Sequence, residues 1–141
     1  MQLKSIFSYV VLFFIVISLK IHAQTTYDSN LSNEQIEKKI DENSNNPIKM
    51  WKLINFYIQK SKKNFDNEAL FYAYRYASIT SKYPLNIKYA DSALVTAKKS
   101  KIKKIVLDAY LNRGNINMAE EFYQKALDDI LVANKLSQEA G

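Results

Sequence analysis

The chain has 141 residues, a formal net charge of +6 at pH 7, and a composition that is 48% hydrophobic and 24% charged. This length predicts one domain, and the charged fraction is too low for a disordered tail. It contains two glycines and two prolines, whereas an all-β sandwich or barrel needs such residues at many turns. Because there is no cysteine, a disulfide framework, thiol catalysis and a cysteine-based zinc site are excluded.

The first 23 residues predict an export signal. Lys4 supplies a positive start, an apolar run follows from Ile6 to Leu19, and Ala23 precedes an expected cleavage before Gln24. The alternative is an uncleaved anchor, because an apolar run of this length can span a thinned bilayer. We therefore expect an exported, most simply periplasmic, protein that touches a membrane through this segment or through parts of a longer protein.

Residues 24–46 predict a polar tether with a short helix. The helix is indicated by Ser32 to Gln35, which has the form of a capping box. Asn46 and Pro47 then predict the start of a longer helix, because Asn caps helices and Pro is favoured at the first helical position. We expect residues 47–69 to form this helix and the turn after it.

From residue 47 onwards the apolar side chains recur every three or four residues, with no convincing run of period two. This spacing predicts amphipathic helices, so the expected fold class is all-α. The predicted apolar stripes are Ile48, Trp51, Ile54, Tyr57 and Ile58; Leu70, Ala73, Tyr74 and Ala77; Ile87, Ala90, Leu94 and Ala97; Ile105, Ala109 and Tyr110; and Tyr123, Ala126, Leu127, Ile130 and Ala133. Asp66 or Asn67 is expected to cap the second of these helices.

A pattern of large and small residues repeats with an offset of 36 residues. Small side chains are needed where the two helices of a hairpin approach closely, and a larger one fills the adjacent gap. The matched pairs are Tyr74 and Tyr110, Ala90 and Ala126, Leu94 and Ile130, and Ala97 and Ala133. Residues 70–141 therefore predict two antiparallel helix pairs, at about 72–105 and 106–141.

On these residues the chain resembles a tetratricopeptide repeat (TPR). The second copy also has Gly114 and Tyr123 in register, whereas the first has Ser78 in place of the glycine and the second has Arg113 where leucine is usual. No glycine lies in the turn at residues 119–121, which leaves open whether residues 102–136 form one helix or two. The resemblance implies helix pairs stacked as a short α-α superhelix. The implied repeat-packing residues are Tyr74, Ala90, Leu94, Ala97, Tyr110, Gly114, Tyr123, Ala126, Ile130 and Ala133.

The same resemblance implies a function, because the first helices of such repeats line a groove for an extended peptide or a helix. The implied groove residues are Tyr72, Arg75, Ile79, Leu111, Asn115 and Met118. Asn115 can hydrogen-bond a peptide backbone, and Arg75 can pair with a carboxylate. We therefore expect an exported module that binds a protein or peptide without catalysis.

A more particular resemblance is to the exported N-terminal part of bacterial AraC-type membrane-bound transcription regulators. It is carried by the predicted signal, by the segment Tyr89 to Ala93 with the lysine-rich turn after it, and by Ala109 to Leu111. It implies that the chain is the sensory part of a longer protein, and that this segment does not bind nucleic acid. The alternative is a complete small exported or membrane-anchored structural or adaptor protein.

Catalytic signals are weak. Ser or Thr nucleophiles normally use a histidine base, and the one histidine, His22, lies in the predicted signal. The acidic doublets at residues 120–121 and 128–129 are candidates for a metal or glycosidase site, but neighbours on a helix point about 100° apart. We expect no catalytic residue, no metal and no cofactor. An enzyme that uses acidic residues alone is the remaining alternative.

Two surface features complete the pattern. Five lysines fall within residues 98–104, which predicts a solvated loop, or alternatively a contact with phosphate or lipid headgroups. The last predicted helix also allows a homodimer through Tyr123, Leu127 and Leu131.

Overall fold

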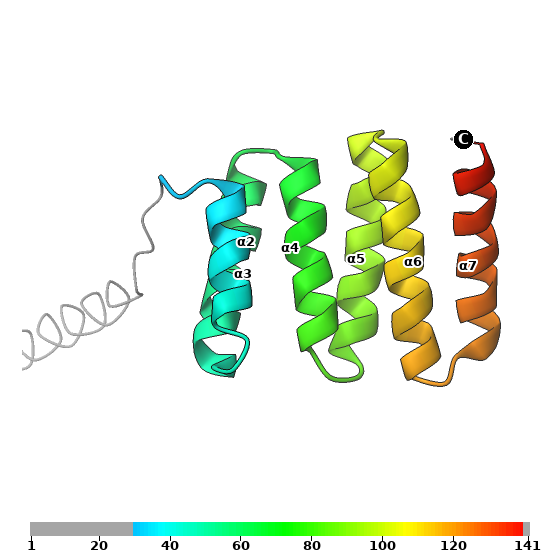
Figure 1. The fold of residues 1–141 in the computed structure, drawn as a ribbon, viewed down its shortest axis with the longest axis horizontal. Coiled ribbons are helices and arrows are strands. Elements are labelled where there is room, and N and C mark those ends of the chain that lie inside the picture. Colours follow the sequence, from blue (N-terminus) through cyan, green and yellow to red (C-terminus); the bar gives the residue numbers. More distant parts are fainter. Residues whose placement is uncertain (1–29, 140–141) are drawn as a thin grey trace, which may run out of the picture. The chain divides into compact units, whose positions relative to one another are not determined.

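The computed structural model describes residues 30–139, and a compact unit begins at Leu31. All regular structure in these residues is helical, which confirms the all-α prediction (Figure 1). The helices are α2 (Asn33–Glu42), α3 (Pro47–Lys63), α4 (Asn67–Thr80), α5 (Leu85–Ser100), α6 (Lys103–Ala119) and α7 (Tyr123–Gln138). The predicted export signal lies outside the described residues.

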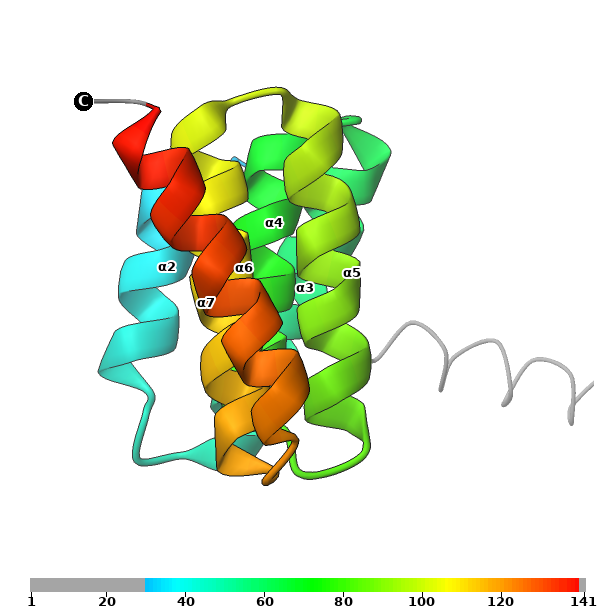
Figure 2. The same cartoon turned by 90° about the vertical axis from the view of Figure 1, so that its right-hand side faces the viewer.

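The six described helices pack in the order in which they occur in the chain. They run alternately down and up in Figure 1, and the most extensive contacts lie within the pairs α4/α5 and α6/α7. The first helices of these two pairs, α4 and α6, also touch each other. Figure 2 shows α2 and α6 toward one side of the unit and α5 toward the other.

Local capping groups set the starts of the first three helices. Ser32 accepts a hydrogen bond from the Gln35 backbone N–H at 3.2 Å, and its own N–H donates to the Gln35 side chain at 2.8 Å. Asn46 caps α3 with Pro47 at the first helical position, and Asp66 caps α4. The predicted capping box and both of the other predicted caps are therefore confirmed, since each satisfies an otherwise unpaired backbone N–H.

The segment from residue 102 to residue 136 forms two helices. The chain reverses between Ala119 and Tyr123 through Glu121, whose φ is 63°. Phe65 and Lys101 have the same left-handed conformation, with φ of 55° and 60°, in the turns before α4 and α6. These turns are therefore made without glycine, at the cost of backbone strain.

Alanine dominates the interior of the unit. Nine of the 18 buried apolar residues in the described part of the chain are alanines, and most lie on α4 and α5. A Cβ placed on Gly114 would lie 3.2 Å from Ile130 Cγ1, so α6 and α7 also approach closely. The helices therefore pack at short distance over small side chains.

The 36-residue period also includes α3, although the residue pattern in the sequence placed only residues 70–141 in the repeat. Ile54, Ile58 and Ser61 are buried 36 residues before Ala90, Leu94 and Ala97, which are buried as well. The left-handed turn residues Phe65 and Lys101 have the same offset. This copy cannot be recognised from residue types, because Ile54 and Ser61 stand where α5 has alanines. The pattern of buried positions is the same in both helices.

The predicted stripe on α3 was wrong at its first residue. Ile48 is 74% exposed, whereas Leu53, which the stripe omitted, is buried. Six residues advance a helix by about 600°, so Ile48 lies about 120° around the helix from Ile54. One buried face cannot contain both residues.

We predict that Lys101→Gly stabilises the protein. Glycine adopts φ near 60° without the clash of a Cβ, so the free energy of unfolding should rise by about 0.5–1 kcal/mol. Lys99→Gly, with the same loss of charge but inside α5, should lower it by a similar amount. Urea unfolding followed by circular dichroism measures both, and equal effects of the two variants would contradict the prediction.

Candidate functional site

The predicted groove residues lie on two helices that contact each other. Tyr72, Arg75 and Ile79 lie on α4, and Leu111, Asn115 and Met118 lie on α6. Their spacings of three, four and seven residues place each set along one helix face. Five of the six are exposed, and Tyr72 is half-buried because its ring packs 4.9 Å from that of Phe71, measured between centroids.

Carboxylates from three helices surround Tyr72. Its pKa is raised first by burial, then by the negative charges of Asp108 on α6, Glu68 on α4 and Glu37 on α2. The charge of Arg75 acts in the opposite direction. We call the surface around these residues of α2, α4 and α6 the α2–α4–α6 face; it carries negative charge in a protein whose formal net charge is positive.

A second tyrosine extends this face toward α2. The hydroxyl of Tyr76 donates a hydrogen bond to Asp41 at 3.5 Å. Burial and then the charges of Asp41 and Glu37 raise the pKa of Tyr76 to about 12. Glu37 is itself held in place by the hydroxyl of buried Tyr57, which donates to it at 2.6 Å.

The expected repeat-packing residues are mostly interior. Ala90, Leu94, Ala97, Gly114, Ala126 and Ala133 are buried, and Tyr74, Tyr110 and Ile130 are partly buried. Tyr123 is instead 60% exposed. It is the first residue of α7, on a side of that helix that no described element covers, so it does not contribute to the interior.

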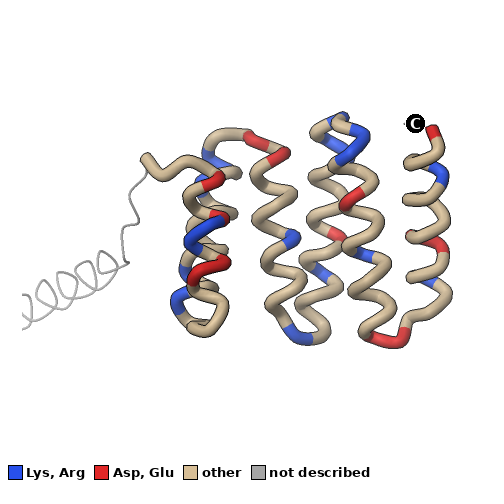
Figure 3. The backbone as a smooth tube through the Cα atoms, in the orientation of Figure 1, with Lys and Arg blue, Asp and Glu red and all other residues tan. Residues whose placement is uncertain are grey.

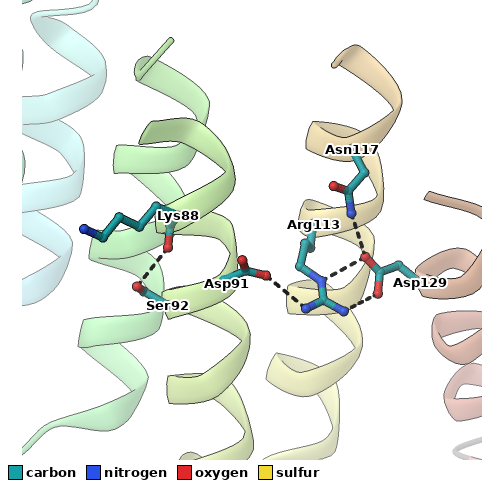
Figure 4. Close-up of polar contacts among 6 residues, drawn as sticks. All are labelled: Lys88, Asp91, Ser92, Arg113, Asn117 and Asp129. Atoms are coloured by element: carbon teal, nitrogen blue, oxygen red, sulfur yellow. Dashed lines mark hydrogen bonds and ion pairs between the residues drawn. The ribbon is translucent and has the colours of Figure 1, made fainter. Parts of the chain in front are cut away.

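Arg113 joins three helices through one ion-pair cluster (Figure 4). Its guanidinium donates to both oxygens of Asp129, at 2.9 Å and 2.6 Å, and to Asp91 at 3.0 Å. Asn117 donates to the same Asp129 carboxylate at 3.1 Å. Asp129 is buried, so the bidentate pair satisfies a charge that would otherwise be costly in the interior.

A second buried polar link joins α4 to α6. Asn112 donates a hydrogen bond to the Ser78 hydroxyl at 3.1 Å, and that hydroxyl donates to the backbone oxygen of Arg75 at 2.8 Å. Sequence reasoning noted Ser78 as a substitute for glycine but missed Asn112. The sequence feature that could have indicated Asn112 is its spacing: it lies three residues after Ala109, on the helix face that the apolar period places inside.

A cavity of about 280 Å³ lies between α3, α4 and α5, away from the predicted groove residues. Two lysines, Lys62 and Lys88, line it together with Tyr74 and Tyr89, whose ring centroids are 6.1 Å apart. Figure 4 shows Lys88 pointing away from the Arg113 cluster. This cavity could not be predicted from the sequence, because its lining comes from three helices.

The lysine-rich turn lies at one end of the unit, between α5 and α6 (Figure 3). Its five lysines are exposed, and the ammonium group of Lys98 lies 5.2 Å from the ring centroid of Tyr110.

Among residues 30–139, no group of three or more His, Cys, Asp and Glu side chains is placed to hold a metal ion. No helix in the same range has the length and apolarity needed to cross a membrane.

We compared the chain with models of known protein families, with curated proteins and with solved structures, and none of the three comparisons returned a match.

We predict that Asp129→Ala lowers the free energy of unfolding by about 3 kcal/mol, because it leaves Arg113 without its bidentate partner. Asp128→Ala removes the same charge from the exposed neighbouring position and should change stability by less than about 0.5 kcal/mol. Denaturant unfolding of the two variants measures the difference. Equal stabilities would show that the Arg113 cluster does not hold α6 and α7 together.

We also predict a loss of stability in alkali through Tyr76. Its folded pKa of about 12 lies above the ordinary 10.0, so its contribution is complete below pH 10 and is lost as the pH rises toward 12. Tyr76→Phe should reduce the fall in unfolding free energy over this interval. Tyr83→Phe, at an exposed site, should not. If the unfolding free energy of both variants depended on pH in the same way, the loss of stability in alkali could not be assigned to Tyr76.

Proposed function

We propose that the chain is an exported, non-catalytic helical-repeat module of the tetratricopeptide type, which binds a protein or peptide. The observation that carries this proposal is the neighbouring placement on α4 and α6 of exposed apolar side chains, Ile79, Leu111 and Met118, beside polar ones. Exposed apolar groups flanked by hydrogen-bonding residues are typical of surfaces that bind other proteins. Helices packed in sequential pairs with a 36-residue period support the repeat type.

Each part of this surface has a role in the proposed complex. The apolar side chains of Ile79, Leu111 and Met118 receive apolar side chains of the peptide. Asn115 hydrogen-bonds its backbone through an amide that can both donate and accept. Arg75 pairs with a carboxylate, while the negative charges near Tyr72 attract a basic residue of the same peptide.

The proposal has a more specific form, in which the module is the exported sensory part of an AraC-type membrane-bound regulator. Ligand binding would then shift the packing between stacked helix pairs and so influence a cytoplasmic half. An antibody against residues 47–139 tests this form in fractionated cells. A membrane band well above 16.4 kDa supports it, and a soluble band slightly below 16.4 kDa supports a free-standing exported binding protein.

We predict that Leu111→Asp and Asn115→Ala each weaken peptide binding by about tenfold, because each removes a central contact. Peptides selected from a displayed random library on the immobilised wild-type protein serve as probes, and fluorescence anisotropy measures their affinity. Val95→Asp, at an exposed site on α5, is the control and should bind normally. Circular dichroism verifies that each variant is folded. Selected peptides that bind all variants equally would exclude this surface.

A further inference from the structure

The cavity between α3, α4 and α5 is a surface distinct from the predicted groove. Its volume of about 280 Å³ is close to the lower end of the range for ligand pockets, roughly 300–1,000 Å³. None of the six predicted groove residues on α4 and α6 lines it. A space of this size suits a small molecule.

The space between α5, α6 and α7, one repeat later, is filled by Arg113. Its guanidinium, from α6, pairs with Asp91 on α5 and Asp129 on α7, and it lies 5.9 Å from the ring centroid of Tyr110. One cation and two carboxylates therefore occupy this space, and their charges are satisfied within the chain.

This cluster is absent between α3, α4 and α5. The residues 36 positions before Arg113, Asp91 and Asp129 are Ala77, Asn55 and Ala93. Asn55 and Tyr74, which correspond to two of the groups around Arg113, both line the cavity. The cavity is therefore the space that remains when a methyl group replaces a long cationic side chain.

The lining of the cavity is positively charged. Lys62 on α3 and Lys88 on α5 contribute to it, and none of the described residues that line it is acidic. Neither lysine has an ion-pair partner among residues 30–139, and Figure 4 shows Lys88 pointing away from the carboxylates of the Arg113 cluster. Both lysines are exposed, so their ammonium groups lie on the solvent side of the cavity. Two unpaired ammonium groups at one cavity attract a negatively charged group.

Tyrosine rings give the cavity an apolar wall. The half-buried rings of Tyr74 and Tyr89 are inclined at 30° to each other, with centroids 6.1 Å apart. Trp51 packs edge-on against Tyr89 at 5.9 Å and so restricts its ring, and buried Ile58 adds aliphatic surface. Aromatic rings accept a flat apolar group against their faces.

We propose that this cavity binds a small organic anion with a flat apolar body and a carboxylate or phosphate group. The apolar body lies against Tyr74, Tyr89 and Ile58, and the anionic group pairs with Lys62 and Lys88. The proposal is independent of peptide binding at the α2–α4–α6 face, because no predicted groove residue contributes to the cavity.

Phenyl phosphate, benzoate and benzyl alcohol are suitable probes, because they share a ring and differ in the charged group. Two-dimensional proton–nitrogen NMR of the full chain measures both affinity and location. At least one anion should give saturable shifts at amides of α3 and α5 around the cavity, with a dissociation constant about tenfold or more below that of benzyl alcohol. The tighter of the two anions identifies the charged group. No saturable shift with either anion, shifts centred elsewhere, or equal affinity for benzyl alcohol would overturn the proposal.

Replacing the lysines tests their role in binding. Lys62→Gln and Lys88→Gln should each weaken binding of the tighter anion by about fivefold, because each removes one of the two charges. Lys98→Gln is the matched control, since Lys98 lies over Tyr110 as Lys62 lies over Tyr74, 36 residues earlier. It should leave the affinity unchanged. Equal losses from Lys62→Gln and Lys98→Gln would overturn the proposal, because the net charge alone would then explain the attraction.

An added carboxylate gives a second test. Asn55→Asp places in the lining the acidic group that α5 has at the corresponding Asp91, and it should weaken anion binding by about fivefold through repulsion. Asn134→Asp adds the same charge at an exposed site on α7 and should have no effect. Circular dichroism verifies that the variants are folded. Unchanged affinity in Asn55→Asp would show that the anion binds elsewhere.

Discussion

The close approach of antiparallel helices over alanine is the constraint on which the rest of the structure depends. Helices α4 and α5 meet through small buried side chains, and Gly114 allows α6 and α7 to do the same. Because methyl groups fill so little of the space between helices, larger residues such as Phe71 and Leu94 are needed to complete the interior. Many of the remaining large side chains are left on the outer faces, where they can contact partners.

An interior of small apolar groups specifies the register between helices only weakly. Buried polar contacts fix this register more firmly. The Ser78–Asn112 hydrogen bond joins α4 to α6, and Arg113 joins α6 to Asp129 on α7. Either contact fails when one helix slides by a turn, since a buried polar group would then lose its partner. Thus Arg113, a departure from the repeat pattern, contributes to packing through its charge.

The same packing divides the surface into two regions with different chemistry. The α2–α4–α6 face combines exposed apolar side chains with carboxylates around Tyr72. The outer side of α7 is apolar along its centre and carries one charge of each sign at its edge.

The sequence by itself determined the fold class, the starts of the first three helices and the alanine pattern, because each depends on residues close together in the chain. Ser32, Asn46 and Asp66 cap helices through contacts three residues away.

Only the tertiary structure decided which distant residues meet. Asp129 pairs with a residue 16 positions away, and Ser78 with one 34 positions away. The copy of the repeat in α3 became visible through burial, since its residue types differ from those of α5. The turn at Glu121 was left open by the sequence because a left-handed residue after a helix is usually glycine; in the structure, the Phe122 N–H closes this turn by donating to the Asn117 carbonyl at 2.8 Å.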